Sequence, residues 1–190
     1  MVKAIVLDVD GTLVCTQIDW DRLRERIRML YRLDDPLKPL GESLYKLLGN
    51  DKRRLEEAFS IIEDAELESI DSLIYDPRLP GLLKELKNKG YSIIIVSMRS
   101  KRTLEPILEK LGIGELVDEV VTREEYHSRL EQLKAIIERY GRENTVFIGD
   151  TSIDEEASSM LQVYFIKATC RSGERNSIAN VIRGLLGDNI

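Results

Sequence analysis

Apolar positions along the chain fall into short continuous runs and into longer segments with helical spacing. The continuous runs lie at 4–7, 91–96, 117–121, 145–148 and 163–166. They are rich in β-branched residues and short, as expected for strands buried on both faces of a sheet. Because these runs alternate with helical segments, we expect a parallel sheet with helices on both faces and right-handed crossovers. The predicted fold class is a doubly wound α/β sheet.

Segments with apolar residues three and four positions apart predict the helices. These segments lie at 19–31, 42–48, 51–67, 82–89, 101–111 and 124–140, with one ending at 161 and one at about 176–186. The first three follow one another without any strand-like alternation before Tyr75. We therefore expect a helical insert, residues 16–76, within a core formed by 1–15 and 77–190.

Polar side chains follow three of the predicted strands. Asp8 and Asp10 end the first strand, Ser97 ends the second, and Asp150 ends the fourth, with Asp154 one helical turn later. The C-terminal edge of a parallel sheet is where open α/β folds bind ligands. Two acids one residue apart at a buried strand end repel each other. Such a pair is tolerated where it binds a cation or reacts with an electrophile. Taken alone, residues 8–12 would equally fit a turn with two solvated acids.

Carboxylates that converge at one sheet edge predict a hard divalent cation. A set of oxygen-only ligands suits Mg²⁺. A carboxylate can also attack phosphorus, and a metal beside it reduces its repulsion from an anionic phosphate. Gly11 would let the chain leave the strand in an unusual conformation, and Gly149 would let it pass close to the metal. Ser97 can donate a hydrogen bond to a phosphate oxygen.

Composition narrows the class of protein. A chain of 190 residues suits one domain, or a core with a small insert, and 43% hydrophobic with 33% charged residues is ordinary for a globular protein. The net charge of −6, without a long basic block, argues against nucleic acid as a partner. No apolar run is long enough for a membrane span, and no signal peptide is visible.

Cys15 and Cys170 show neither metal nor disulfide spacing, so a reduced, cytoplasmic setting is expected.

Three motifs occur in order: DVDGT at 8–12, IIIVS at 93–97 and GDTSID at 149–154. On these motifs the sequence resembles the haloacid dehalogenase superfamily of phosphohydrolases, in the branch of phosphoglycolate phosphatase, with a helical cap after the first strand. The resemblance covers essentially the whole core. It implies a Mg²⁺-dependent phosphatase that hydrolyses a small phosphorylated metabolite, a phosphate monoester, through an aspartyl-phosphate. We expect a monomer or a homodimer.

The resemblance also implies roles for the acidic residues. Asp8 would be the nucleophile. Asp10 would be the general acid for the leaving group and then the base for water, and the crowded site would favour its protonated form. Asp8, the backbone carbonyl of Asp10 and Asp150 would hold Mg²⁺. Asp154 would either bind Mg²⁺ directly or lie in its second coordination shell.

Further side chains would contact the phosphate and the substrate. Thr12 and Ser97 would steady the phosphoryl group, and Met98 and Arg99 follow Ser97 closely enough to reach the substrate. The family pattern expects a lysine before the helix that precedes Gly149, often followed by proline. The stretch VVTREEYHSRLEQLK contains no Lys-Pro. A cation is still needed there, and the candidates are Arg129, which lies nearest, Arg123 and Lys134.

The predicted cap would close over the phosphate and exclude water. One or two of its cations are expected to face the crevice and contact a second anionic group of the substrate. The candidates are Arg22, Arg24, Arg26, Arg28, Lys46, Lys52, Arg53 and Arg54. Two other functions stay open: a sugar-phosphate phosphotransferase or mutase, and a catalytically inactive binding protein that lost its activity with the lysine.

Overall fold

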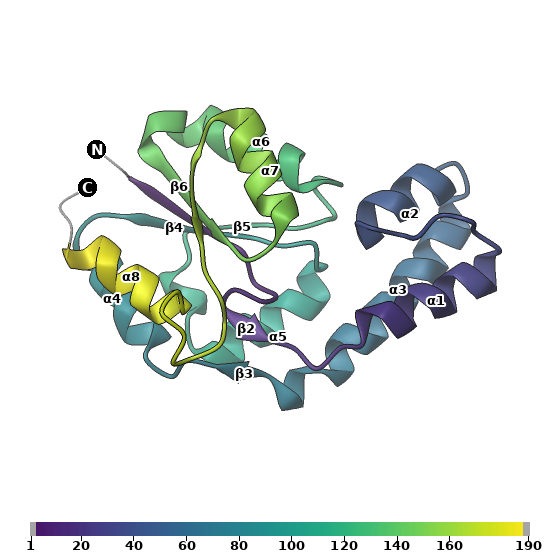
Figure 1. Ribbon diagram of the computed structural model, residues 1–190, viewed down its shortest axis with the longest axis horizontal. Helices are drawn as coiled ribbons and strands as arrows, with labels where there is room; N and C mark the ends of the chain where they lie inside the picture. Colours follow the sequence, from purple (N-terminus) through teal and green to yellow (C-terminus); the bar gives the residue numbers. More distant parts are fainter. Residues whose placement is uncertain (1–2, 188–190) are drawn as a thin grey trace.

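A five-stranded parallel sheet forms the centre of the computed structural model, which describes residues 3–187 (Figure 1). The strands are β1 (Ala4–Leu7), β4 (Ser92–Val96), β5 (Glu119–Val121), β6 (Thr145–Gly149) and β7 (Tyr164–Lys167). Their order is β5-β4-β1-β6-β7, so that the first strand in the chain is the central one. Ile5 lies opposite Ile93 on one side and Val146 on the other. The predicted α/β class is confirmed, and the ends of β1, β4 and β6 meet at one edge.

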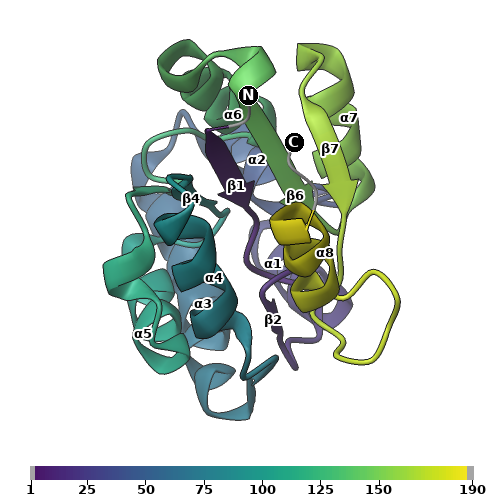
Figure 2. The ribbon, with the colours of Figure 1, turned by 90° about the vertical axis from the view of Figure 1, so that its left-hand side faces the viewer.

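Helices cover both faces of the sheet (Figures 1 and 2). One face carries α4 (Leu79–Asn88), α5 (Lys101–Leu111) and α8 (Ile178–Gly187); the other carries α6 (Arg129–Tyr140) and α7 (Ser152–Leu161). Alternate residues of β1 point to opposite faces of the sheet and pack against the helices of the two faces. Ile5 and Leu7 pack in the first, and Ala4 and Val6 pack in the second. Burial on both faces explains why this strand is apolar at every position.

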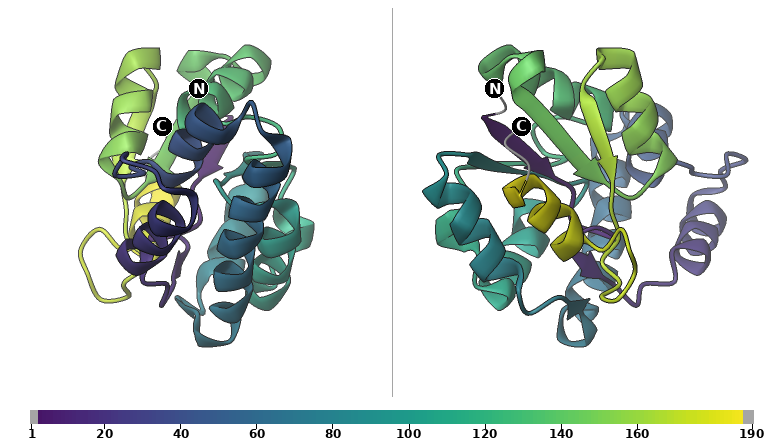
Figure 3. Two further views of the ribbon diagram at one scale, coloured as in Figure 1. Left: turned by 90° about the vertical axis from the view of Figure 1, so that its right-hand side faces the viewer. Right: turned by 60° about the vertical axis from the view of Figure 1, so that its left-hand side comes forward.

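Three further helices lie beyond the C-terminal ends of the strands (Figures 1 and 3). They are α1 (Trp20–Tyr31), α2 (Leu40–Leu48) and α3 (Lys52–Glu68), and they share an apolar cluster that includes Ile27, Leu44 and Ile62. The carboxylates of Asp19 and Asp51 accept hydrogen bonds from the backbone at the starts of α1 and α3, at 3.0 and 3.2 Å. Both caps match the start positions that the sequence predicts.

The chain reaches these helices and returns through a small antiparallel pair, β2 (Val14–Cys15) and β3 (Ile74–Tyr75). The sequence predicted no such pair, because two residues are too few to show alternation. Three short 3₁₀ helices, η1 (Ile70–Ser72), η2 (Gly114–Leu116) and η3 (Arg142–Asn144), connect longer elements.

Two predicted helix starts were wrong. The helix expected from residue 124 begins at Arg129, with Ser128 as its cap. The preceding residues turn instead, because the carboxylates of Glu124 and Glu125 accept hydrogen bonds from the backbone of Lys101 and Thr122, at 2.8 and 2.9 Å. The helix expected from residue 82 begins at Leu79, because the ring of Pro80 suits a first helical turn.

The two cysteines form a disulfide, contrary to the sequence prediction. Cys15 and Cys170 are 155 positions apart, with Cα atoms 5.4 Å from each other. The segment after β7 returns to the first motif, where the backbone N–H of Cys170 donates to the carbonyl of Gly11 at 2.7 Å. Spacing along the chain cannot show such a pairing. The cysteines therefore give no support to a reduced setting. Within residues 3–187, no helix combines the length and apolar character needed to cross a membrane.

The disulfide closes a loop of 155 residues, so its loss should increase the conformational entropy of the unfolded chain. Reduction is expected to lower the free energy of unfolding by about 4–5 kcal/mol, from the entropy of a closed loop of roughly that length. Urea titrations with and without dithiothreitol measure the change. The control is Cys15→Ala/Cys170→Ala, whose midpoint should match that of the reduced protein and ignore the reductant. A wild-type midpoint that is the same with and without reductant would contradict the prediction.

Candidate active site

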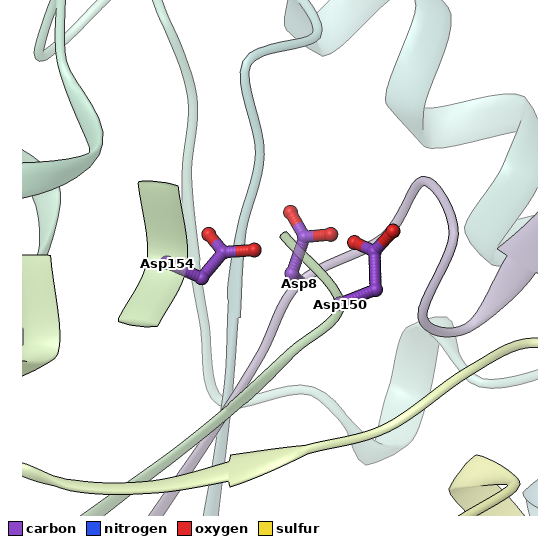
Figure 4. Close-up of side chains that lie close together, drawn as sticks. All are labelled: Asp8, Asp150 and Asp154. Atoms are coloured by element: carbon purple, nitrogen blue, oxygen red, sulfur yellow. The ribbon is translucent and has the colours of Figure 1, made fainter. Parts of the chain in front are cut away.

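Three aspartates converge at the C-terminal edge of the sheet (Figure 4). Asp8 follows β1, Asp150 follows β6, and Asp154 lies in the first turn of α7. One carboxylate oxygen of each lies within 4.8 Å of those of the other two. Asp154 is fixed by a capping box, in which its Oδ2 accepts from the backbone N–H and the hydroxyl of Thr151, at 3.1 and 2.7 Å. The structure thus brings together three of the four acids that the sequence predicts.

Two glycines make this close approach sterically feasible. A Cβ atom at Gly11, whose φ is +84°, would lie 2.1 Å from Oδ2 of Asp150. A Cβ atom at Gly149 would lie 2.7 Å from Oδ2 of Asp154. Gly149, expected from the sequence to let the chain pass close to the metal, makes room for the Asp154 carboxylate in the structure. Any larger residue at either position would push the acids apart.

Arg129 lies among the three acids. Its Nη2 donates to Asp8, and its Nε lies 2.8 Å from Oδ1 of Asp154. Its Nη1 donates to Gln132 at 2.9 Å, and Gln132 donates to the carbonyl of Ser97 at 2.8 Å. The guanidinium is therefore held on several sides, and Arg129 is only 6% exposed.

The other two candidate cations lie elsewhere. Arg123 forms ion pairs with Glu63 and Glu66 of α3, both at 3.1 Å. Lys134 is exposed on α6. Of the three cations that the sequence leaves open, the structure places Arg129 at the predicted nucleophile.

One guanidinium does not compensate the two buried carboxylates of Asp8 and Asp154 and the half-buried carboxylate of Asp150. Burial raises the pKa of Asp8 well above its usual value, and the charges of Asp154, Asp150 and Asp10 add to this effect, although Arg129 opposes it. Burial and the Asp154 charge raise the pKa of Asp150 to about 6. The hydroxyl of Thr12 lies within hydrogen-bond distance of both Asp8 and Asp150, at 3.3 and 3.4 Å. This excess of negative charge on oxygen ligands suits a divalent cation.

Asp10 is not part of the three-acid cluster and pairs with Arg99 instead. Nε and Nη2 of Arg99 donate to the two carboxylate oxygens of Asp10, at 2.7 and 2.8 Å. The Asp10 side chain is 27% exposed and that of Arg99 is 1% exposed. From the sequence we expect a crowded acidic site that favours the protonated form of Asp10, and a substrate contact for Arg99. In the structure the group facing Asp10 is a guanidinium, and the two side chains bind each other.

Ser97 and Met98 lie with Arg99 in the loop between β4 and α5. The Ser97 hydroxyl accepts a hydrogen bond from the Arg99 backbone at 3.1 Å, and the Met98 carbonyl accepts one from Arg123 at 2.9 Å. Arg123 contacts Glu66 of α3, which is 2% exposed. Sequence reasoning missed Glu66. The available signal was its helical spacing from Ala58 and Ile62, which are also buried.

A cleft of about 1470 Å³ opens over Asp10, Gly11 and Asp150. Helix α1, helix α2 and the segment between them supply one wall of it. The loops after β6 and β7 supply the other. The cleft therefore reaches the candidate site at Asp10 and Asp150, whereas Asp8 is buried behind this lining.

The raised pKa of Asp150 predicts a pH-dependent stability for the metal-free protein. Between the ordinary value of 3.8 and about 6 the folded state binds a proton that the unfolded state has lost, so stability falls as pH rises through this window. Asp150→Asn removes this contribution. Its stability advantage over wild type, measured by thermal unfolding in EDTA, should grow between pH 4 and pH 6 and then level off. The exposed Asp71→Asn is the control, and an advantage of Asp150→Asn that is independent of pH would contradict the assignment.

Removal of the Arg129 charge should destabilise the protein strongly. Arg129→Met leaves the three acids without their buried cation, and we expect a loss of about 3–5 kcal/mol in the free energy of unfolding without metal. Arg139→Met, on the same helix, removes a half-exposed partner of Glu119 and should cost at most about 1 kcal/mol. Equal losses in the two variants, in urea titrations, would show that the buried cluster does not depend on Arg129.

Comparisons with known proteins agree with this geometry. Residues 2–159 match the family model of the haloacid dehalogenase-like hydrolases. Phosphoserine phosphatase of Methanocaldococcus jannaschii is 26% identical over 80% of this chain and 79% of its own length, and pyrophosphatase PpaX of Bacillus mycoides is 26% identical over 80% and 77%. The structure of a predicted phosphatase of Clostridium acetobutylicum superposes with a TM-score of 0.68, at 17% identity, over 99% of this chain and 100% of that one. The family match covers most of the chain, which therefore belongs to the haloacid dehalogenase-like hydrolases.

Proposed function

We propose that this hydrolase is a Mg²⁺-dependent phosphatase, similar to phosphoglycolate phosphatase, that acts on a small phosphate monoester through an aspartyl-phosphate. The observation that carries the proposal is the buried guanidinium of Arg129 between Asp8 and Asp154. A fixed cation beside a nucleophilic carboxylate is what an incoming phosphate dianion requires. The arginine takes the place of the missing lysine, with a planar fork instead of a point charge.

Asp8, Asp150 and the backbone carbonyl of Asp10 are the proposed Mg²⁺ ligands. The raised pKa values of Asp8 and Asp150 support this choice, because burial and the neighbouring acids disfavour their charged forms more than Arg129, which pairs with Asp8, can offset. Asp154 already accepts hydrogen bonds from Arg129 and Thr151. We therefore propose that it positions Arg129 and does not bind Mg²⁺ directly. When bound, Mg²⁺ would neutralise phosphate charge and thereby let an anionic nucleophile approach.

The residues would then act in two steps. A carboxylate oxygen of Asp8 attacks phosphorus, the bond from phosphorus to the leaving oxygen breaks, and Asp10 gives that oxygen a proton. Asp10 next takes a proton from the water that attacks the aspartyl-phosphate, which releases phosphate and restores Asp8. Arg129, Thr12 and Ser97 would hold the phosphoryl oxygens. Both oxygens of Asp10 bind Arg99, so each proton transfer needs one of these hydrogen bonds to loosen.

Residues 16–76 are the proposed cap, and 1–15 with 77–190 are the proposed core. The cap would exclude water while the aspartyl-phosphate exists. Its helix α3 is fastened to the core by the buried pair of Glu66 and Arg123. The proposed partner is a small metabolite, bound by a monomer or homodimer in the cytoplasm. The Cys15–Cys170 disulfide argues against a reducing compartment, where disulfides are rare, so the redox state of these two cysteines in cells tests the proposed location.

The test is phosphate release from p-nitrophenyl phosphate with and without Mg²⁺. Wild type should require Mg²⁺, and Asp8→Asn should lose at least about 1000-fold in kcat, because the nucleophile is gone. Asp10→Asn should accumulate a phosphorylated protein, visible by mass spectrometry after acid quenching, because it lacks the base for the second step. Equal release by wild type and Asp8→Asn would refute the proposed nucleophile.

A further inference from the structure

Gln132 is a polar side chain on the buried face of α6, which it shares with Leu133 and Ile136, and it is 0% exposed. Burial of an amide costs free energy unless both of its ends are hydrogen-bonded. Both ends are bonded here, because Oε1 accepts from Nη1 of Arg129 at 2.9 Å and Nε2 donates to the Ser97 carbonyl at 2.8 Å. Gln132 thus joins two of the residues that are proposed to hold the phosphoryl oxygens.

The chemistry of the two partners fixes the orientation of this amide. A guanidinium only donates hydrogen bonds, and a backbone carbonyl only accepts them. The carbonyl end of the Gln132 amide must therefore face Arg129, and its NH₂ end must face Ser97. A glutamate in its place would put an acceptor against the Ser97 carbonyl, and a methionine would leave both partners without a hydrogen bond.

Arg129 presents its donors in a rigid plane, so its contacts decide where each nitrogen points. Nε pairs with Asp154 and Nη2 pairs with Asp8, and these two nitrogens form one edge of the guanidinium. Cζ lies 5.6 Å from the centroid of the Phe147 ring, which covers one face of the plane. Nη1 lies outside the acidic edge, and its hydrogen-bond partner is Gln132. Gln132 therefore holds the side of the guanidinium that the acids do not reach.

A lysine at position 129 would not need Gln132. An ammonium group is a point charge on a flexible stem, so it can pair with Asp8 and Asp154 without a defined plane. An arginine without Gln132 would instead have a buried donor with no partner, and turning Nη1 toward another acceptor would withdraw Nη2 from Asp8. The requirement for Gln132 is therefore specific to an arginine at this position.

We propose that Gln132 is a positioning residue, which orients Arg129 toward Asp8 and links it to the loop of Ser97. It acts through Arg129 and does not contact the phosphate. The inference rests on the proposed function for the position of the phosphate, and it adds the residue on which an arginine in place of the lysine depends. Because Gln132 bridges Arg129 and Ser97, these two phosphoryl contacts would keep a fixed spacing when the substrate binds.

A double-mutant cycle on the turnover of p-nitrophenyl phosphate in Mg²⁺ tests this role. Gln132→Met keeps the length of the side chain and removes both hydrogen bonds. In the wild-type background it should lower kcat/KM at least about 10-fold, because Arg129 loses the contact that orients it. In the Arg129→Lys background, which has no Nη1, the loss should be less than about 3-fold, because only the bond to Ser97 remains to be lost. A residue that merely supports the fold would lose the same factor in both backgrounds.

Lys134→Met is the matched control, because Lys134 is exposed on the same helix. It should keep the kcat/KM of each background. If circular dichroism shows that Gln132→Met is unfolded, Gln132→Asn replaces it. Gln132→Asn keeps the amide but shortens its reach by one methylene, so its loss should depend on the background in the same way. Equal losses in the two backgrounds would overturn the inference.

Binding of inorganic phosphate separates a failure of this inference from a failure of the proposed function. Isothermal titration in Mg²⁺ repeats the cycle without turnover, and Gln132→Met should weaken binding at least about 10-fold in the wild-type background and less than about 3-fold in Arg129→Lys. This binding pattern without phosphate release would refute the proposed function and support the inference. Turnover that depends on Asp8, with equal losses in the two backgrounds, would refute the inference alone. A wild type that neither binds phosphate nor releases it would overturn both.

Discussion

Repulsion among Asp8, Asp150 and Asp154 is the constraint on which the rest of the structure depends. Three carboxylates with oxygens within 4.8 Å of one another are unstable unless cations compensate them. The buried guanidinium of Arg129 meets part of this need, and Gln132 and the capping box of α7 fix the groups in place. The uncompensated remainder is what makes the sheet edge suited to a divalent cation and a phosphate. Without a bound cation these acids destabilise the folded state, and the proposed Mg²⁺ would relieve their repulsion.

A series of ion pairs and hydrogen bonds connects the site to the helical insert. Asp10 binds Arg99, whose backbone carbonyl accepts from the backbone of Arg123 at 3.3 Å, and Arg123 in turn binds Glu66 of α3. Burial raises the pKa of Glu66, which is the cost of placing a carboxylate inside this contact. Breaking a buried ion pair strongly destabilises a protein. The pair of Arg123 and Glu66 therefore holds α3 against the core near Asp10, the proposed general acid. Helix α1, in contrast, faces the cleft with Arg24.

The disulfide joins two segments that border the cleft. Cys15 stands where the chain leaves the sheet for the insert, and Cys170 stands in the loop after β7, which lines the cleft. The bond therefore joins the start of the insert to the opposite wall of the cleft. A cross-link at this place limits how far the two walls can separate, which suits a site that has to exclude water during phosphoryl transfer.

The sequence by itself determined the sheet, the order of its elements and the acids at its edge. These features are local: a buried parallel strand is apolar throughout, Asp8 and Asp150 directly follow strand ends, and Asp154 comes one helical turn after Asp150. Tertiary structure alone decided which cation reaches Asp8, because Arg129 is 121 positions away and competed with Arg123 and Lys134. It also decided the pairing of Cys15 with Cys170 and of Asp10 with Arg99. Such contacts depend on how distant segments pack, and no spacing along the chain encodes them.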